Sequence, residues 1–245
     1  MIFEIQREVP LCLCDCTDHL SLYGVARMFQ DAADSHTTGE GIGYQQLLQE
    51  GKAWVLYRIA YQTYFMPEAG ASVTLRTWSR GVDKLFALRD TQMFDSKGNL
   101  CVCSTSYWVI IDMERRRVCR MHDKVINYEH TPLQATTFKT LGKIDFHASD
   151  AELVSQFVVP QSSIDHTFHV NNAEYIRWIS DQIAAERDVP IQYNPQKEIL
   201  ELNYLLETRR DETVLIRREH SSQGEIFSIE NPRGTSALCR YHVLQ

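Results

Sequence analysis

Apolar residues recur at helical spacing in two parts of the chain, and each part is followed by segments with strand character. The first helical pattern runs from about Ser21 to His36 and the second from about Asn172 to Arg187, with apolar side chains three and four residues apart. Turn-forming residues separate the segments that follow, as is typical of strands joined by short connections. The predicted strands are Ala53–Met66, Ser72–Arg80, Phe86–Phe94 and Leu100–Asp112 in the first half, and Glu198–Thr208, Thr213–Glu219, Ile226–Glu230 and Ala237–Leu244 in the second.

One helix followed by several antiparallel strands, found twice, predicts a fold of the α+β class with two units, each a long helix wrapped by an antiparallel sheet. The stretch 125–145 has little periodicity and is typical of a linker. We therefore expect a first domain at residues 1–126, a linker at 127–146 and a second domain at 147–245. A chain of 245 residues has room for two such domains of about 120 residues each.

The two halves also resemble each other just before their helices. Asp18-His19 and Asp165-His166 each follow a short strand-like stretch and precede a helical pattern, which aligns the halves with an offset of 147 positions. With this offset Leu22 stands opposite His169, so the first half is expected to lack the polar cluster around His169. The alignment therefore predicts one active site per chain, in the second half.

Three reactive side chains precede the second helix. Asp165, Thr167 and His169 are two residues apart, so they point to one side if this stretch is extended. The helix is expected to begin at Asn171 or Asn172, because either amide can cap it. Reactive groups beside the positive end of a helix, with its free N–H groups, form a site suited to stabilising a developing oxyanion.

The helix start carries a second signal. Glu174 follows Asn171 by three residues, which is the spacing of a capping box. Further along the chain, Glu201, Asn203, Leu205 and Glu207 alternate as the more polar face of a predicted strand, which lets the Glu207 carboxylate reach a cleft without burying a lone charge.

Composition and charge exclude several classes of protein. Hydrophobic residues make up 44% of the chain and charged residues 23%, which is ordinary for a globular protein in water. The net charge of −7 argues against general nucleic-acid binding. No apolar run approaches the ~20 residues that cross a bilayer, and the first residues lack the apolar core of a signal peptide, so a cytoplasmic location is expected.

The seven cysteines fit a reduced compartment. Cys12, Cys14 and Cys16 alternate, as do Cys101 and Cys103, so each group is expected on one strand face as small buried side chains. Zinc remains an alternative, but no Cys-x-x-Cys pair is present and the Cys-x-Cys spacing suits a tetrahedral site poorly. We therefore expect no metal site.

Several blocks of residues stand out in order along the chain. They are Asp18-His-Leu-Ser-Leu22, Trp54-Val-Leu-Tyr-Arg58, Leu85-Phe-Ala-Leu-Arg89, Glu114-Arg-Arg-Arg-Val118, and His169-Val-Asn-Asn172 followed by Tyr175. Together these blocks resemble those of a known family, the acyl-acyl carrier protein (acyl-ACP) thioesterases of plants and bacteria. This resemblance covers most of the chain and implies a double hot-dog fold.

The resemblance also implies an active site. The family segment Asp-x-Asn-x-His-Val-Asn-Asn places catalytic groups at Asp165 and His169, with Thr167 where the family has Asn. A second motif, similar to Tyr-Arg-Arg-Glu-Cys, falls on residues 204–208 and retains the acid as Glu207. Thr208 replaces the Cys of that motif, so the resemblance favours water as the attacking group, activated by Glu207 or His169.

Further roles follow from the same resemblance. Asn171 and Asn172 are expected to cap the helix and position the substrate, and the first domain is expected to supply the acyl pocket. A basic run, Arg115, Arg116, Arg117 and Arg120, would attract an acidic carrier protein, although a solvated hairpin is the alternative. The oligomeric state stays open, with a homodimer as one alternative.

The function implied is hydrolysis of acyl-ACP thioesters to free fatty acid, which ends fatty-acid synthesis and needs no cofactor. Three alternatives remain at this stage. The chain could hydrolyse acyl-coenzyme A, it could bind acyl groups without catalysis, or it could be a hot-dog dehydratase, since those enzymes also use an acid with a histidine. No Gly-x-Ser-x-Gly elbow is present, which argues against an α/β-hydrolase.

Overall fold

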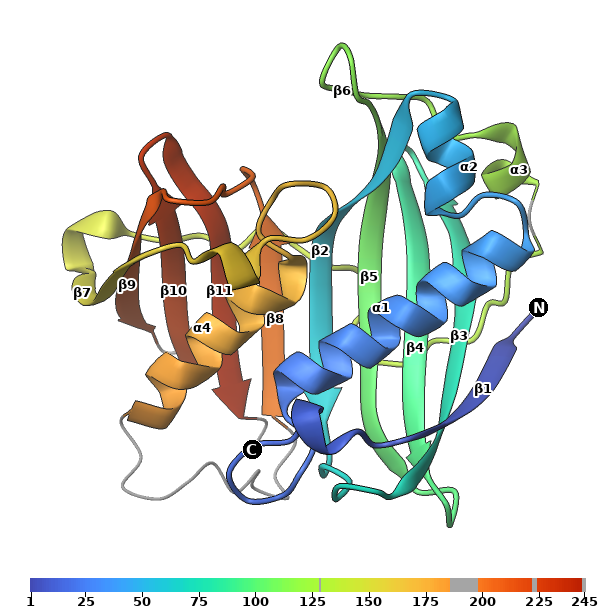
Figure 1. The fold of residues 1–245 in the computed structure, drawn as a ribbon, viewed down its shortest axis with the longest axis horizontal. Coiled ribbons are helices and arrows are strands. Elements are labelled where there is room, and N and C mark those ends of the chain that lie inside the picture. Colours follow the sequence, from blue (N-terminus) through green and yellow to red (C-terminus); the bar gives the residue numbers. More distant parts are fainter. Residues whose placement is uncertain (128, 186–197, 222–223, 244–245) are drawn as a thin grey trace. The chain divides into compact units, whose positions relative to one another are not determined.

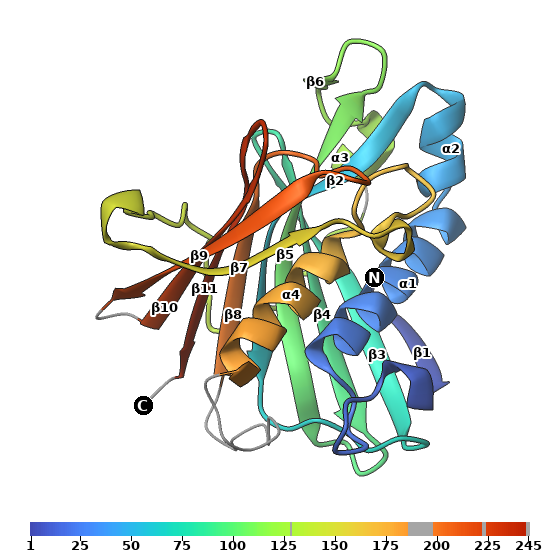
Figure 2. The same ribbon diagram turned by 60° about the vertical axis from the view of Figure 1, so that its left-hand side comes forward.

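The structure is a computed structural model that describes the chain except residues 128, 186–197, 222–223 and 244–245. It divides into two compact units, Met1–Leu141 and Gly142–Gln245. Each unit contains one long helix and one antiparallel sheet, as the sequence pattern predicts, and Figures 1 and 2 show both.

The sheet of the first unit has the strand order β1-β3-β4-β5-β2, with β6 added to β5. Every neighbouring pair in it is antiparallel. Its elements are β1 (Phe3–Glu8), α1 (Leu22–Gly39), α2 (Tyr44–Gln49), β2 (Lys52–Thr63), β3 (Ser72–Asp83), β4 (Phe86–Asp95), β5 (Leu100–Asp112), β6 (Arg117–Val118) and α3 (Asp123–Ile126).

Helix α1 lies along one face of this sheet (Figure 2). Its apolar stripe includes Val25, Phe29 and Ala32, which are all buried, and Phe29 stacks on Tyr61 of β2 with ring centroids 6.3 Å apart. The helix begins after Ser21, whose hydroxyl oxygen accepts a hydrogen bond from the N–H of Gly24 at 3.0 Å. Burial of this stripe against the sheet forms the core of the unit.

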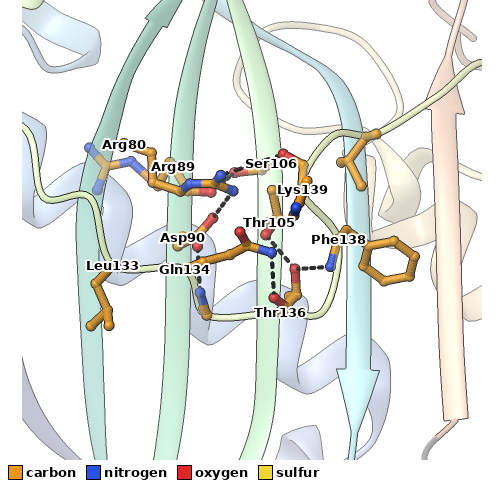
Figure 3. Close-up of polar contacts among 12 residues, drawn as sticks. Arg80, Arg89, Asp90, Thr105, Ser106, Leu133, Gln134, Thr136, Phe138 and Lys139 are labelled. Carbon is orange, nitrogen blue, oxygen red and sulfur yellow. Dashed lines mark hydrogen bonds and ion pairs between the residues drawn. The ribbon is translucent and has the colours of Figure 1, made fainter.

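The other face of the same sheet is crossed by residues 133–141, which we call the strap. Because successive side chains of a strand point to opposite faces, Asp90 faces the strap while Arg89 faces α1 and bonds to His36. Figure 3 shows the polar contacts in the middle of the strap. From β3 through β4 and β5 to β2, the contacts are Trp78 to Leu133, Asp90 to Ala135, Thr105 to Thr136, Tyr107 to Leu141 and Arg58 to Leu141.

The sheet of the second unit has the strand order β8-β11-β10-β9-β7, again antiparallel. Helix α4 packs on this sheet through two aromatic pairs. The ring centroids of Trp178 and Phe157 of β7 are 4.9 Å apart, and those of Tyr175 and Tyr204 of β8 are 5.5 Å apart. The elements are β7 (Glu152–Val158), α4 (Asn172–Ala185), β8 (Glu198–Tyr204), β9 (Thr213–Ser221), β10 (Gly224–Asn231) and β11 (Gly234–Val243).

Most predicted elements are present, with shifted ends. Strand β5 has the predicted limits, whereas the strand expected at Glu198–Thr208 ends at Tyr204. Strands β1 and β7 and helix α2 were not predicted. The end predicted for the second helix, Arg187, lies outside the described residues. Residues 129–141 of the expected linker belong to the first unit, and the domain limits 126/127 and 146/147 stay a prediction.

The cysteines only partly follow the prediction. Cys101 and Cys103 are buried in β5, as expected. Cys12 and Cys16 are exposed, because residues 11–13 form a 3₁₀ turn and not a strand, so their alternation does not mark a buried face. In the described part of the chain no group of three or more His, Cys, Asp or Glu residues could hold a metal ion. No described helix is long and apolar enough to span a bilayer.

Candidate active site

The loop before α4, residues 161–171, forms a tight turn that holds the predicted site residues. A bridge pairs Ile164 with Val170, and the N–H of Asp165 donates to the carbonyl of His169 at 2.9 Å. Phe168, at the tip, has a φ of 63°, in the left-handed region. The expectation of an extended segment with three side chains on one face is therefore wrong, because the chain reverses direction at residues 166–168.

The carboxylate of Asp165 organises this loop. Its Oδ1 accepts hydrogen bonds from the backbone N–H of Thr167 at 2.8 Å and from the Thr167 hydroxyl at 2.6 Å, and its Oδ2 accepts one from Nδ2 of Asn171 at 3.2 Å. Three donors on one carboxylate fix the turn. Asp165 and Thr167 therefore contact each other within a turn.

Asn171 caps α4. Its side-chain Oδ1 accepts from the N–H of Ala173 at 3.0 Å. The predicted capping box is wrong, because the N–H of Asn171 already donates to the carbonyl of Ser163 at 3.0 Å. Glu174 is buried and instead accepts from the Ser163 hydroxyl at 3.2 Å and pairs with Arg177.

Asn172 is the first residue of α4. Its carbonyl accepts a hydrogen bond from the hydroxyl of Tyr204 at 2.9 Å. Tyr204 is the last residue of β8, so this bond joins the start of the helix to the end of that strand. The two asparagines therefore differ, since Asn171 acts as the cap and the backbone of Asn172 anchors the helix to the sheet.

His169 contacts the second predicted acid. Its Nε2 lies 2.9 Å from Oε2 of Glu207, and both side chains are partly exposed, at 33% and 21%. The residues that follow them are joined directly, because the N–H of Val170 donates to the carbonyl of Thr208 at 2.9 Å. This bond holds the two side chains next to each other.

Glu207 does not lie on the polar face of a strand, although its alternation with Glu201 and Asn203 predicted this. Strand β8 ends at Tyr204, and the N–H groups of Leu205 and Leu206 both donate to the carbonyl of Ser236, at 2.8 and 3.1 Å. Two successive amides on one carbonyl mean that the chain bends there, so Glu207 lies in the connection after β8. Its Oε1 also pairs with Arg209 and lies 3.6 Å from Nη1 of Arg233.

Thr208, which stands where the family motif has Cys, is fully buried. Its hydroxyl oxygen accepts a hydrogen bond from Nδ2 of Asn231 at 3.3 Å, and the hydroxyl of Tyr175 bonds to it as well. Burial raises the pKa of Tyr175 to about 12, so that hydroxyl stays protonated. These contacts give Thr208 a structural role.

The first unit contains a second loop of the same design, residues 11–21. Asp15 accepts hydrogen bonds from the backbone N–H and the hydroxyl of Thr17 at 2.8 and 2.6 Å. The N–H of Asp15 donates to the carbonyl of His19 at 2.8 Å. The Asp-x-Thr-x-His pattern and its hydrogen bonds therefore occur twice in the chain.

This geometry corrects the alignment of the two halves. Asp165 corresponds to Asp15 with an offset of 150 positions, whereas the Asp-His dipeptides predicted 147 and matched it with Asp18. The expectation that the first half lacks an equivalent of His169 is therefore wrong, because His19 stands at that position. The Asp-His dipeptides gave the wrong offset because Asp18-His19 ends its turn, whereas Asp165-His166 begins its turn.

The first loop lacks the acidic partner. The N–H of Leu20 donates to the carbonyl of Pro67 at 2.9 Å, which matches the bond from Val170 to Thr208, so Met66 stands where the second unit has Glu207. Met66 is buried, and Nδ1 of His19 lies 2.8 Å from the carbonyl of Thr17. Within the described residues, the pairing of this loop histidine with a carboxylate is a feature of the second unit.

The basic run lies where β5 turns into β6. Arg115, Arg116, Arg117 and Arg120 are all exposed. The N–H of Arg115 donates to Asp112 at 2.8 Å, and its guanidinium lies 3.8 Å from the same carboxylate. The run therefore forms an exposed hairpin, which both of its interpretations require.

The family model for the N-terminal domain of acyl-ACP thioesterases matches residues 2–128, and the model for the C-terminal domain matches residues 146–236. A palmitoyl-acyl carrier protein thioesterase of Gossypium hirsutum is 28% identical over 72% of this chain and 43% of its own length. An oleoyl-acyl carrier protein thioesterase of Arabidopsis thaliana is 25% identical over 83% of this chain and 59% of its own length.

Solved structures agree on the fold. An acyl-ACP thioesterase of Bacteroides thetaiotaomicron superimposes with a TM-score of 0.85 at 19% identity, covering 99% of this chain and 98% of its own. The 12:0-ACP thioesterase of Umbellularia californica superimposes with a TM-score of 0.80 at 18% identity, covering 99% of this chain and 98% of its own. These matches confirm the double hot-dog fold. The chain spans about half the length of the curated relatives it matches, and its two matched domains show that it belongs to the acyl-ACP thioesterase family.

Proposed function

We propose that this protein hydrolyses acyl-ACP thioesters and releases the free fatty acid, the reaction that ends fatty-acid synthesis. The observation that carries the proposal is the contact of 2.9 Å between Nε2 of His169 and Oε2 of Glu207 beside the start of α4. An imidazole held by a carboxylate is a suitable acceptor for a proton from water. Membership of the family supports an acyl thioester as the substrate.

The reaction needs a nucleophile, a proton acceptor and a stabilised oxyanion. Water attacks the thioester carbonyl carbon, and the His169–Glu207 pair takes up the proton that water loses. The tetrahedral oxyanion lies at the N-terminal end of α4, where the helix dipole favours negative charge. The carbon–sulfur bond then breaks, and the pair returns its proton to the thiolate, so the products are a fatty acid and a free thiol.

The other site residues position these groups. Asp165 and Thr167 hold the turn that precedes His169. Asn171 fixes the first turn of α4, and Asn172 joins it to β8. Thr208 is buried and bonded, which supports water, in place of a covalent side-chain nucleophile, as the attacking group.

The carrier and the location belong to the same proposal. The exposed hairpin with Arg115, Arg116, Arg117 and Arg120 is proposed to attract acyl carrier protein by its charge. The first domain is proposed to supply the acyl pocket. A cytoplasmic location stays a prediction, and the two plant relatives described above are named as chloroplastic.

The decisive experiment measures thiol release from one acyl chain carried on acyl carrier protein and on coenzyme A. His169→Ala is expected to lower kcat by about 10²–10⁴-fold, the usual contribution of a positioned acid or base. His166→Ala, a second imidazole in the same loop, is the matched control and should keep its activity. Full activity in His169→Ala would refute the assigned site, and faster release from coenzyme A would refute the proposed carrier.

A further inference from the structure

We propose that Arg233 is a positioning residue for the proposed hydrolysis, acting through Glu207. Arg233 lies in the turn between β10 and β11, 26 residues after Glu207. Its Nη2 donates to the backbone carbonyl of Glu207 at 2.5 Å, and its Nη1 lies 3.6 Å from Oε1 of the Glu207 carboxylate. One guanidinium therefore contacts both the main chain and the side chain of the acid that pairs with His169.

The turn that carries Arg233 is itself tied to the site. Asn231 is buried, and its Nδ2 donates to the carbonyl of Glu207 at 3.0 Å and to the hydroxyl of Thr208 at 3.3 Å. Oδ1 of Asn231 accepts from the N–H of Arg233 at 2.9 Å. The backbone of Arg233 is therefore placed by the same residue that holds the connection containing Glu207.

A second acid holds Arg233 from its other side. Both oxygens of Glu212 lie close to Nη2 of Arg233, at 3.1 and 3.2 Å, and Oε2 of Glu212 also accepts from the N–H of Arg209 at 2.9 Å. The side chain of Arg233 is 39% exposed and that of Glu212 is 18% exposed. A guanidinium fixed between two carboxylates has little rotational freedom, so it can hold Glu207 in one orientation.

The two oxygens of Glu207 have different partners as a result. Oε1 faces Arg209 and Arg233, whereas Oε2 faces Nε2 of His169 at 2.9 Å. A carboxylate oxygen accepts a hydrogen bond from Nε2–H, which leaves the lone pair of the ring on Nδ1. Arg233 thereby keeps the imidazole in one tautomer and one orientation.

This inference rests on the proposed hydrolysis, and the experiment separates the two. Arg233→Met is expected to lower kcat for acyl-ACP by about 10–100-fold with little change in KM, because Arg233 acts on the orientation of Glu207 in the chemical step. The acid limb of the pH profile of kcat/KM should move to higher pH, because Glu207 loses a positive neighbour and accepts a proton more readily. A residue that only stabilised the fold would leave this pH profile unchanged.

The matched control is Arg210→Met. Arg210 lies one residue from Arg209, is 60% exposed, and pairs with Asp211 and Gln161. This variant should keep both kcat and the pH profile. Arg233→Lys retains the charge and should recover part of kcat with the original acid limb. If Arg233→Met does not fold, Glu212→Gln loosens Arg233 from its other side and should lower kcat with little change in KM.

The outcomes are distinguishable. Failure of the unmodified protein to release thiol would overturn the proposed function itself. Normal release by the unmodified protein, together with an unchanged pH profile in folded Arg233→Met or an unchanged kcat in Glu212→Gln, would overturn the role of Arg233 and leave the function standing. Equal losses of kcat in Arg210→Met and Arg233→Met would likewise overturn it, because removal of any nearby positive charge would then explain the loss.

Discussion

Asp15 and Asp165, 150 positions apart, accept the same two hydrogen bonds from the threonine two residues later, at 2.8 and 2.6 Å in both units. The two loops also share a residue in the left-handed region, with φ of 60° at Asp18 and 63° at Phe168. The same turn is therefore built twice, and the difference between the units lies in what the histidine of each turn contacts.

The first prediction compares the two histidines. His19→Ala should leave kcat for thioester hydrolysis within about twofold, because the position that faces it holds Met66 in place of an acid, so it lacks the pairing expected of a general base. His169→Ala should lose most activity. Steady-state thiol release from both variants checks this. A comparable loss in His19→Ala would show that the first loop takes part in the chemistry.

The second prediction concerns the paired aspartates. Asp15→Ala and Asp165→Ala each remove a carboxylate that accepts bonds from its threonine, so both should lower the free energy of unfolding by about 1–3 kcal/mol. Only Asp165→Ala should also lower kcat, because its turn places His169. Denaturant unfolding and thiol release measure the two effects. Equal kinetic losses in the two variants would contradict the assignment of catalysis to the second unit.

The third prediction uses the buried imidazole of His36. Burial, and then the charge of Arg89, lower the pKa of His36 from 6.5 to about 4. The neutral ring also accepts a hydrogen bond at Nδ1 from Arg89 at 3.0 Å, and it stacks on Phe3. The unfolded chain therefore binds a proton at this residue at a higher pH than the folded chain does.

The sign of the pH effect follows from this difference. The contribution of His36 to stability is present above about pH 6.5 and is lost as the pH falls towards 4, by about 1–3 kcal/mol after allowance for solvent screening. Unfolding midpoints between pH 7 and pH 4 measure it. His36→Gln keeps an acceptor for Arg89 but does not titrate, so its curve should be flatter. Parallel curves for the two proteins would count against this explanation.

The fourth prediction concerns the strap. Oδ2 of the fully buried Asp90 accepts from the N–H of Ala135 at 2.6 Å, and Oδ1 lies 3.4 Å from Arg80. Asp90→Ala leaves that buried N–H without its acceptor and should cost about 1–3 kcal/mol of unfolding free energy. Burial raises the pKa of Asp90, so its charged form is already disfavoured. Asp90→Asn keeps an acceptor oxygen and should cost less, and an equal cost would contradict this account.

The fifth prediction tests the basic hairpin. Arg117→Glu with Arg120→Glu should raise KM for acyl-ACP several-fold at low salt, and the difference should shrink at high salt because exposed charges are screened. Hydrolysis of acyl-coenzyme A serves as the control substrate and should change less. Lys97→Glu, an exposed cation in the turn between β4 and β5, is the control variant. The same rise in KM with Lys97→Glu would indicate a general effect of net charge.

Periodicity in the sequence was sufficient for most of the fold. The apolar stripe of α1 and the mostly buried residues of β5 are local patterns, and both elements were predicted within a few residues. Strands β1 and β7 were not predicted, although a strand as short as Ile226–Glu230 was. Cys12 and Cys16 show the opposite error, because their alternation predicted a strand where the chain forms turns and leaves both side chains exposed.

The candidate site was only partly predictable, because its contacts depend on chain reversals. Phe168 takes a left-handed conformation that its residue type does not favour, so no local signal marked the turn at residues 166–168. The pairing of His169 with Glu207 joins residues 38 positions apart, and family resemblance, not spacing, brought them together. The contact of Arg233 with Glu207 comes from a different hairpin, and neither pattern nor motif indicated it.

The strap gives the connection between the two halves an unexpected property. Residues 133–141 are bonded in turn to four strands of the first unit. The buried polar groups beneath them, such as Asp90 in Figure 3, depend on that cover. A proteolytic nick or an inserted peptide in this stretch would therefore expose the interior of the first unit to water. Such a break would destabilise that unit, whereas a break in an ordinary linker would only separate two domains.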